Sequence, residues 1–214
     1  MAKKQEGDSK MANTTNTKKN LGISEMIKLG LVLVCYAVAS CAVLAIVNNF
    51  TLPKIKQNQI NKANTAMKQV FPAADSFEAV DNFEKSSVSV INLSDFYLVK
   101  LGGEVIGAIV QAAGPTYDKG KIIVGIKKDG TVEGVRILEL SDSPGFGLKA
   151  NDSSFKLPSG LTFYDQFSGK KSSDGFTVNE TFDGISGATI TSKGIGDLVN
   201  EACKSMNAYF KSGR

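Results

Sequence analysis

The chain has 214 residues and a net charge of +4, and 42% of its residues are hydrophobic, a composition typical of a globular domain with additional segments. It contains no His, which removes the usual general base and the commonest metal ligand, so any chemistry depends on carboxylates, hydroxyls or a bound cofactor. Two of the three Cys lie in an apolar run and one near the chain end, a pattern that indicates neither a disulfide framework nor a metal site (Cys35, Cys41, Cys203).

The basic excess lies in the N-terminal segment. The first 28 residues hold six Lys against three acidic residues, whereas the chain from Lys54 onward is nearly neutral. The excess does not indicate a nucleic-acid-binding surface, so we expect no nucleic-acid partner. Residues 1–25 are polar and rich in Lys, Asn and Thr, which predicts a disordered cytoplasmic tail. Met11 is an alternative start to Met1.

An apolar run from Leu29 to Val47 contains no charged residue. As a helix it is roughly 28 Å long, which matches the hydrocarbon core of a bilayer, about 30 Å thick. A cleaved signal peptide is the alternative, but the run is longer than a signal h-region and lacks a small-x-small cleavage site. We therefore predict a retained transmembrane helix at residues 26–50, in contact with membrane lipid.

Lys residues on the two sides of this span predict its orientation. The Lys-rich segment before the span favours a cytoplasmic N-terminus. Lys54, Lys56, Lys62 and Lys68 follow the span, so the asymmetry is mild. We predict a single-pass protein of the plasma (inner) membrane whose globular domain lies outside the cytoplasm.

The rest of the chain predicts an α+β fold. Residues 51–72 have a weak helical period closed by Phe71-Pro72, so we expect a connecting helix followed by one domain at residues 73–214. Residues 73–87 are acidic and irregular. An amphipathic helix is predicted from about Ser192 to Phe210.

Between these helices the sequence predicts an antiparallel sheet. Asp129-Gly130 between two β-branched runs is a strong hairpin signature. The expected strands are Phe96–Leu101, Val105–Gln111, Ile122–Ile126 and Thr131–Glu139, with Phe163–Phe167 and Thr177–Thr181 as further candidates.

Three glycine-rich segments, at residues 114–120, 141–149 and 183–193, could carry chemistry. Each has a simpler explanation, because Gly and Pro mark turns and because Thr191 or Ser192 is a good N-cap for the last helix. The third segment also suits an anion, since its small residues allow close backbone approach and its hydroxyls and N–H groups lie at a helix N-terminus. The residues alone do not distinguish a bound phosphate from a covalently attached one.

The third segment resembles a known motif. Asp183-Gly184-Ile185-Ser186-Gly187-Ala188-Thr189, followed by Ile190-Thr191-Ser192-Lys193, resembles the flavinylation motif of the FMN-binding domain family. In that family a dedicated flavin transferase joins FMN, through a phosphoester, to the Thr of Gly-Ala-Thr. The resemblance implies that Thr189 carries covalent FMN and that the transferase reads Asp183. Thr191 is the rival acceptor, but the family motif ends at Gly-Ala-Thr and favours Thr189.

The resemblance covers nearly the whole chain after residue 25. With its apolar span and its loops, the chain is similar to the RnfG family, which supplies one subunit of the Rnf ion-translocating ferredoxin:NAD oxidoreductase, and to the related NqrC family. This similarity implies an electron-relay subunit whose partners are other membrane subunits of an Rnf-type complex and the flavin transferase. Asp142-Ser143 stands where the family usually has Glu-Thr, and Phe146 where it usually has Leu; both differences keep the chemical character.

Together, the motif and the loops give a set of expected FMN-binding residues. Tyr117 and Phe146 are expected to pack against the isoalloxazine, with ordinary core packing as the alternative, and amides around Gly145–Gly147 to donate to its polar edge. No residue is expected to be catalytic. Two other functions stay open: a stand-alone membrane-anchored flavoprotein for electron transfer, and a scaffold module without a redox role. The full set is Thr189, Ser186, Gly187, Ala188, Ile190, Thr191, Tyr117, Ser143, Pro144, Gly145, Phe146 and Gly147.

Overall fold

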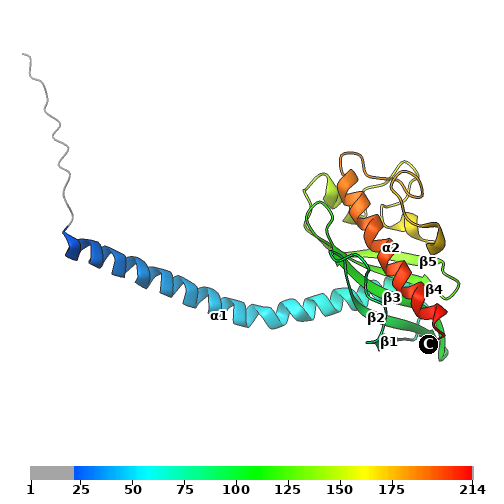
Figure 1. Cartoon of the computed structure of the whole chain (residues 1–214), viewed down its shortest axis with the longest axis horizontal. Coiled ribbons are helices and arrows are strands. Elements are labelled where there is room, and N and C mark those ends of the chain that lie inside the picture. Colours follow the sequence, from blue (N-terminus) through cyan, green and yellow to red (C-terminus); the bar gives the residue numbers. More distant parts are fainter. Residues whose placement is uncertain (1–21, 214) are drawn as a thin grey trace, which may run out of the picture. The chain divides into compact units, whose positions relative to one another are not determined.

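The computed structural model describes residues 22–213 (Figure 1), so the tail predicted at residues 1–25 lies, up to residue 21, outside the described part of the chain. Two compact units are present: the first ends at Ile55 and the second begins at Lys56. The elements are α1 (Ile23–Val70), β1 (Ser76–Val80), β2 (Asn92–Leu101), β3 (Glu104–Gly114), β4 (Gly120–Lys127), β5 (Val132–Leu140) and α2 (Thr189–Lys211), with short 3₁₀ helices at Gly147–Asn151, Asp165–Phe167 and Ser172–Asp174.

In the first unit the described residues form the N-terminal part of α1. Large apolar side chains on it are exposed, for example Leu33 by 69% and Leu44 by 68%. Among the described helices, α1 is the one that is long and apolar enough to cross a membrane, and it contains the span predicted at residues 26–50. The helix does not end with that span but continues past Pro53, which lacks a backbone N–H, to Val70.

The second unit contains one antiparallel sheet whose strands pair in chain order, β1-β2-β3-β4-β5, which confirms the predicted α+β class. The first four expected strands correspond to β2–β5, and β4 and β5 form the hairpin predicted at Asp129-Gly130. The prediction of irregular structure for residues 73–87 is wrong where β1 lies. Since β1 is short and only partly buried, its pairing with β2, and not its own pattern, makes it a strand.

Two further strand predictions are wrong. Phe163–Phe167 forms a turn and a 3₁₀ helix, and Thr177–Thr181 forms a turn flanked by an isolated bridge between Val178 and Phe182. Turns can bury large side chains as strands do, so apolar content alone predicts the wrong element here. The aromatic rings instead form a cluster with centroids 4.9 to 6.1 Å apart, made by Phe163, Phe167, Phe176 and Phe182.

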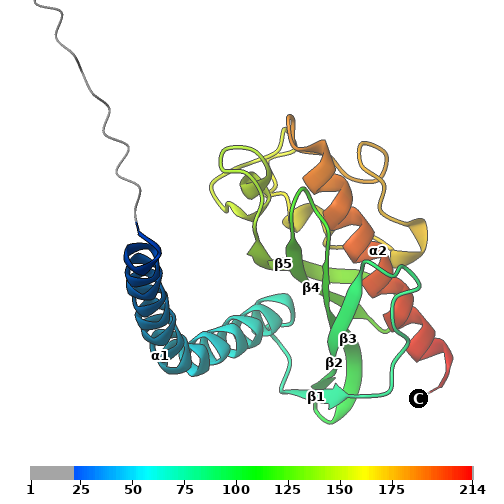
Figure 2. The ribbon, with the colours of Figure 1, turned by 60° about the vertical axis from the view of Figure 1, so that its left-hand side comes forward.

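Helices cover both faces of the sheet. Successive side chains of a strand point to opposite faces, so Val110 and Val124 pack into the core beneath α2, whereas Ile109 and Ile123 pack with the end of α1. Both views show α2 lying across one face of the sheet (Figures 1 and 2), where it contacts β3 and β4.

The last turns of α1 belong to this packed domain. Residues 51–72, expected as a connecting helix, are helical to Val70, and Val70 and Phe71 are only 3% and 4% exposed. Gly125 on β4 makes this close seating possible: a Cβ there would lie 2.5 Å from Val70 Cγ1 and 2.7 Å from Phe71 Cε2. Any larger residue at this position would have to push the end of the helix away from the sheet.

We therefore expect Gly125→Ala to lower the free energy of unfolding by about 1–3 kcal/mol, the usual cost of overpacking a core. The matched control is Gly134→Ala on β5, directly opposite Gly125, where a Cβ would lie 3.7 Å from Val70 in ordinary contact. Thermal unfolding of the full chain in detergent measures both. Equal effects of the two substitutions would show that the close contact at Gly125 does not govern the packing.

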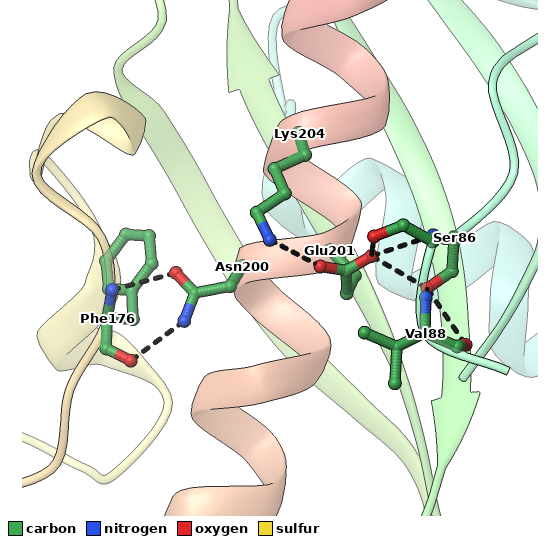
Figure 3. Close-up of polar contacts among 7 residues, drawn as sticks. Ser86, Val88, Phe176, Asn200, Glu201 and Lys204 are labelled. Carbon is green, nitrogen blue, oxygen red and sulfur yellow. Dashed lines mark hydrogen bonds and ion pairs between the residues drawn. The ribbon is translucent and has the colours of Figure 1, made fainter. Parts of the chain in front are cut away.

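On its outer side, α2 holds two loops through polar side chains (Figure 3). The Asn200 amide accepts a hydrogen bond from the Phe176 N–H at 2.8 Å and donates one to the Phe176 carbonyl at 2.9 Å. The Glu201 carboxylate, only 4% exposed, accepts from Ser86 Oγ at 2.7 Å and from Lys204 at 2.6 Å. Each loop is thereby tied to one turn of the helix.

The hydrogen bonds to Glu201 decide its charge. Burial acts to raise its pKa, but the bonds from Lys204, Ser86 and the Ser87 N–H outweigh burial and lower the pKa below its ordinary value. A lowered carboxyl pKa stabilises the folded state above the unfolded-state pKa, about 4.3, and this contribution is lost as the pH falls through the folded-state pKa.

Glu201→Gln should therefore lower the free energy of unfolding at pH 7 by about 1–3 kcal/mol, because it removes a charged acceptor from buried donors. Its difference from the unsubstituted chain should shrink as the pH falls below about 4.3. Asp197→Asn is the control, since it changes the same charge in an exposed ion pair on the same helix and should cost less than about 1 kcal/mol. A difference that stays constant down to acidic pH would contradict this role of the carboxylate.

Candidate functional site

Segments far apart in the sequence form one cleft at the N-terminal end of α2. Its volume is ≈ 440 Å³, within the range of roughly 300–1,000 Å³ typical of small-molecule sites. The lining comes from the β3–β4 loop, the loop after β5, the turn before α2 and the first residues of α2. It consists of Tyr117, Ser143, Phe146, Gly147, Gly187, Ala188, Thr189, Ile190 and Thr191, all of which belong to the set expected from the sequence.

A tight turn leads the chain into α2. The Ile185 carbonyl accepts a hydrogen bond from the Ala188 N–H at 2.9 Å, and Gly187 has a φ of 79°, a left-handed conformation that favours glycine. Ser186 lies at the corner of this turn and does not line the cleft. Thr189 follows as the first residue of α2, with its side chain exposed.

Ser192, which is fully buried, holds the turn from inside. Its hydroxyl accepts a hydrogen bond from the Ile185 N–H at 3.0 Å and donates one to the Ala188 carbonyl at 3.0 Å. The expected N-cap role of Thr191 or Ser192 is wrong, because α2 begins at Thr189 and Ala188 occupies the cap position without a side-chain cap. The turn, and not a hydroxyl cap, sets the start of the helix.

Asp183 is fixed through its backbone and leaves its carboxylate exposed. The side chain of Gln166, 6% exposed, accepts from the Asp183 N–H at 2.8 Å and donates to the Asp183 carbonyl at 3.1 Å. The same amide nitrogen donates to the Phe163 carbonyl at 3.0 Å. A carboxylate on a rigid backbone and facing solvent is available to another protein.

Pro144 and Gly145 form the turn of the second loop and do not line the cleft. This turn brings the Phe146 ring against Gly187, where a Cβ would lie 3.2 Å from the ring. Phe146 is 55% exposed and Tyr117 is 66% exposed. Neither ring belongs to the core, so both are free to contact a molecule in the cleft.

Asp142 joins the segments that form the cleft. Its carboxylate, 4% exposed, accepts hydrogen bonds from Thr116 Oγ1 at 2.7 Å and from the Asp118 N–H at 2.9 Å. Burial acts to raise its pKa, but hydrogen bonds from the Thr191 hydroxyl, from the Asp118 and Tyr117 N–H groups and from Thr116 outweigh burial and lower the pKa. Asp142 is therefore charged at neutral pH.

Sequence patterns do not indicate these supporting roles. Asp142 next to Ser-Pro-Gly has the pattern of a turn residue, Gln166 lies in a run expected as a strand, and Ser192 has the pattern of a helix cap. All three are polar residues that become buried only because distant segments pack around them, so their sequence neighbours give no signal.

The cleft fits the FMN that the sequence motif implies. Its described lining contains no charged side chain and presents two exposed aromatic rings, which suits a flat, largely apolar ring system. The first N–H paired within α2 is that of Ser192, bonded to the Ala188 carbonyl at 3.0 Å. The earlier N–H groups of the helix lack helical partners, and the helix dipole favours a phosphate there by roughly 0.3–1 kcal/mol.

Comparison with known families covers both parts of the chain. The FMN-binding domain family matches residues 117–204, a range that begins at Tyr117 and contains the whole cleft. The RnfG N-terminal region matches residues 17–70, which include α1.

Individual relatives are similar over nearly their full length, and each is the G subunit of an ion-translocating complex. That of the Na⁺-translocating ferredoxin:NAD⁺ oxidoreductase of Acetobacterium woodii is 33% identical over 205 residues, which cover 87% of this chain and 94% of the relative. That of the ion-translocating oxidoreductase of Vibrio atlanticus is 29% identical over 197 residues, with coverage of 84% and 90%. That of the proton-translocating ferredoxin:NAD⁺ oxidoreductase of Clostridium ljungdahlii is 27% identical over 190 residues, with coverage of 86% and 91%.

The turn before α2 gives a prediction that needs no cofactor. Ser192→Ala leaves the buried Ile185 N–H without an acceptor and should lower the free energy of unfolding by about 1–3 kcal/mol. Ser186→Ala, an exposed serine in the same turn, should change it by less than about 0.5 kcal/mol. Thermal unfolding of the full chain in detergent compares them; an unchanged stability of Ser192→Ala would show that this hydroxyl does not hold the turn.

Proposed function

The chain belongs to the RnfG family, and on this basis we propose that it relays electrons within a membrane-bound ion-translocating ferredoxin:NAD oxidoreductase complex, carrying FMN covalently on Thr189. Family membership and the FMN-binding domain make it a membrane-anchored electron-transfer subunit. The observation that carries the covalent assignment is the place of Thr189, exposed at the first position of α2 within the cleft.

The surroundings of the two candidate hydroxyls support Thr189 over Thr191. Thr189 is exposed, whereas Thr191 is 2% exposed and its hydroxyl hydrogen-bonds to Asp142. A hydroxyl must reach the phosphorus of an incoming flavin nucleotide to form an ester. Thr189 meets this requirement in the folded chain and Thr191 does not.

Attachment requires an activated phosphate, as in a flavin dinucleotide supplied to the flavin transferase. A bond forms between Thr189 Oγ1 and the flavin-side phosphorus while the pyrophosphate P–O bond breaks. The nucleoside monophosphate leaves with the bond electrons, and the hydroxyl proton passes to a base of the transferase. No electron is gained or lost overall. The described lining of the cleft contains no basic side chain, so the transferase must supply this base.

Once attached, FMN supplies one- and two-electron transfer, and the protein supplies position and shielding. Thr189 tethers the cofactor, and the unpaired N–H groups of the first turn of α2 lie where its phosphate would be. Tyr117 and Phe146 lie where they can cover a flat ring. Thr189 acts as a tether and not as a catalytic residue.

The partners follow from the relatives. Those of Acetobacterium woodii and Clostridium ljungdahlii are named as subunits of Na⁺- and proton-translocating complexes, and we assign this chain to a complex of that kind. Its other proposed partner is a flavin transferase that reads the exposed carboxylate of Asp183. The Lys-rich N-terminus is proposed to face the cytoplasm, with the FMN domain on the other side of the membrane.

Thr189→Val tests the covalent link. Co-expressed with a flavin transferase, the unsubstituted chain should give a fluorescent flavin band on a denaturing gel, and Thr189→Val should give none, because it lacks the attacking oxygen. Thr191→Val, which removes a buried hydroxyl two residues away, should keep the band. A band that persists in Thr189→Val and disappears in Thr191→Val would reverse the assignment.

Co-purification tests the place of the chain in a complex. The detergent-solubilised protein should carry polytopic membrane subunits with it when isolated from its native membrane. A flavin-loaded protein that elutes without such partners would support the stand-alone flavoprotein instead.

A further inference from the structure

We propose that Asp142 selects the acceptor: it joins the loops of the cleft to the first turn of α2 and holds the Thr191 hydroxyl inside the protein, so that Thr189 alone faces the flavin. This inference rests on the proposed function, because it concerns which hydroxyl receives the flavin. Asp142 would act through other residues and would be a positioning residue.

The geometry around Asp142 is that of a junction between loops. Oδ1 accepts from Thr116 Oγ1 at 2.7 Å and from the Asp118 N–H at 2.9 Å, and Oδ2 accepts from the Tyr117 N–H at 3.3 Å. These three residues belong to the β3–β4 loop, whereas Asp142 itself precedes the loop that carries Phe146. One carboxylate thus ties together the two loops that supply the aromatic rings of the cleft.

The same carboxylate reaches α2. Oδ2 of Asp142 and Oγ1 of Thr191 lie around Gly147, where a Cβ would come within 2.8 Å of the first and 2.5 Å of the second. Gly147 therefore leaves room for the carboxylate and the hydroxyl to meet, and the Thr191 hydroxyl donates to Asp142. Thr191 is 2% exposed, although it lies two residues from an exposed threonine in the same first turn of helix.

The charge on Asp142 makes this arrangement selective. Hydrogen bonds to a charged group are about twice as strong as those between neutral groups, so the Thr191 hydroxyl has little tendency to turn toward the cleft. The exposed Thr189 hydroxyl has no such acceptor among the hydrogen bonds of the described residues. Removing the carboxylate should free the second hydroxyl and loosen the loops that cover it.

The test asks where flavin attaches when Thr189 is absent. The full chain with Thr189→Val, co-expressed with a flavin transferase, should carry no flavin on Thr191 in peptide mass spectrometry. Adding Asp142→Ala should raise the flavin on Thr191 roughly tenfold or more over that background, since a charge-assisted hydrogen bond no longer holds the hydroxyl. Asp118→Ala, an exposed carboxylate in the neighbouring loop, is the matched control and should produce no rise.

Two further chains make every outcome informative. Asp142→Ala with Thr189 present should still carry flavin on Thr189, which shows that the variant folds and that the transferase accepts it. Asp142→Asn keeps the volume and the acceptor for Thr116 and Asp118, and with Thr189→Val it should also raise the flavin on Thr191. The site of modification is a readout that a merely structural role of Asp142 would not move.

The inference is overturned if neither Asp142 variant places flavin on Thr191 while both still accept it on Thr189. Loss of flavin from Thr189 in the Asp142 variants would overturn it too, because Asp142 would then be needed for attachment and not for choice. If the chain with Thr189 and Asp142 both intact carries no covalent flavin, the proposed function fails, and acceptor selection fails with it.

Discussion

The packing of α2 against β3 and β4 is the interaction on which the rest of the domain depends. It buries a complete apolar face, including Ile195, Leu198 and Val199, each fully buried. Because the helix is seated along its length, its N-terminal turn has one fixed position at the loop end of the sheet. The cleft is built on that turn, so the energy of the core holds the site in place even though most of the cleft consists of loops.

Long loops of this kind need partners for their buried polar groups. Between β5 and α2 the chain contains only 3₁₀ helices and turns, yet it lies against the core through four phenylalanine rings. Single side chains then fix the backbone at the places that matter: Asp142 between the cleft loops, Gln166 at Asp183, Ser192 at the turn before Thr189. The irregular part of the domain is thereby as specified as its sheet.

The chemistry of the cleft agrees with an electron relay. A relay cofactor needs a fixed position, a low charge around its ring and no nearby group that reacts with it. The described lining offers aromatic rings, glycines, hydroxyls and free helix N–H groups, and the nearest carboxylate is buried and fully hydrogen-bonded. The apolar helix α1 adds the membrane anchor that a subunit of a membrane complex requires.

The sequence by itself determined the span within α1, the central strands, the hairpin at Asp129-Gly130 and the residues that line the cleft. Those features depend on local patterns: apolar length, β-branched runs, turn chemistry and a contiguous motif around Thr189. Tertiary structure alone decided that Phe163–Phe167 is not a strand, that β1 pairs at the sheet edge, and that α2 begins at Thr189. It also decided that Thr189 is exposed while Thr191 is buried on Asp142, because the two threonines differ only in what distant loops place against them.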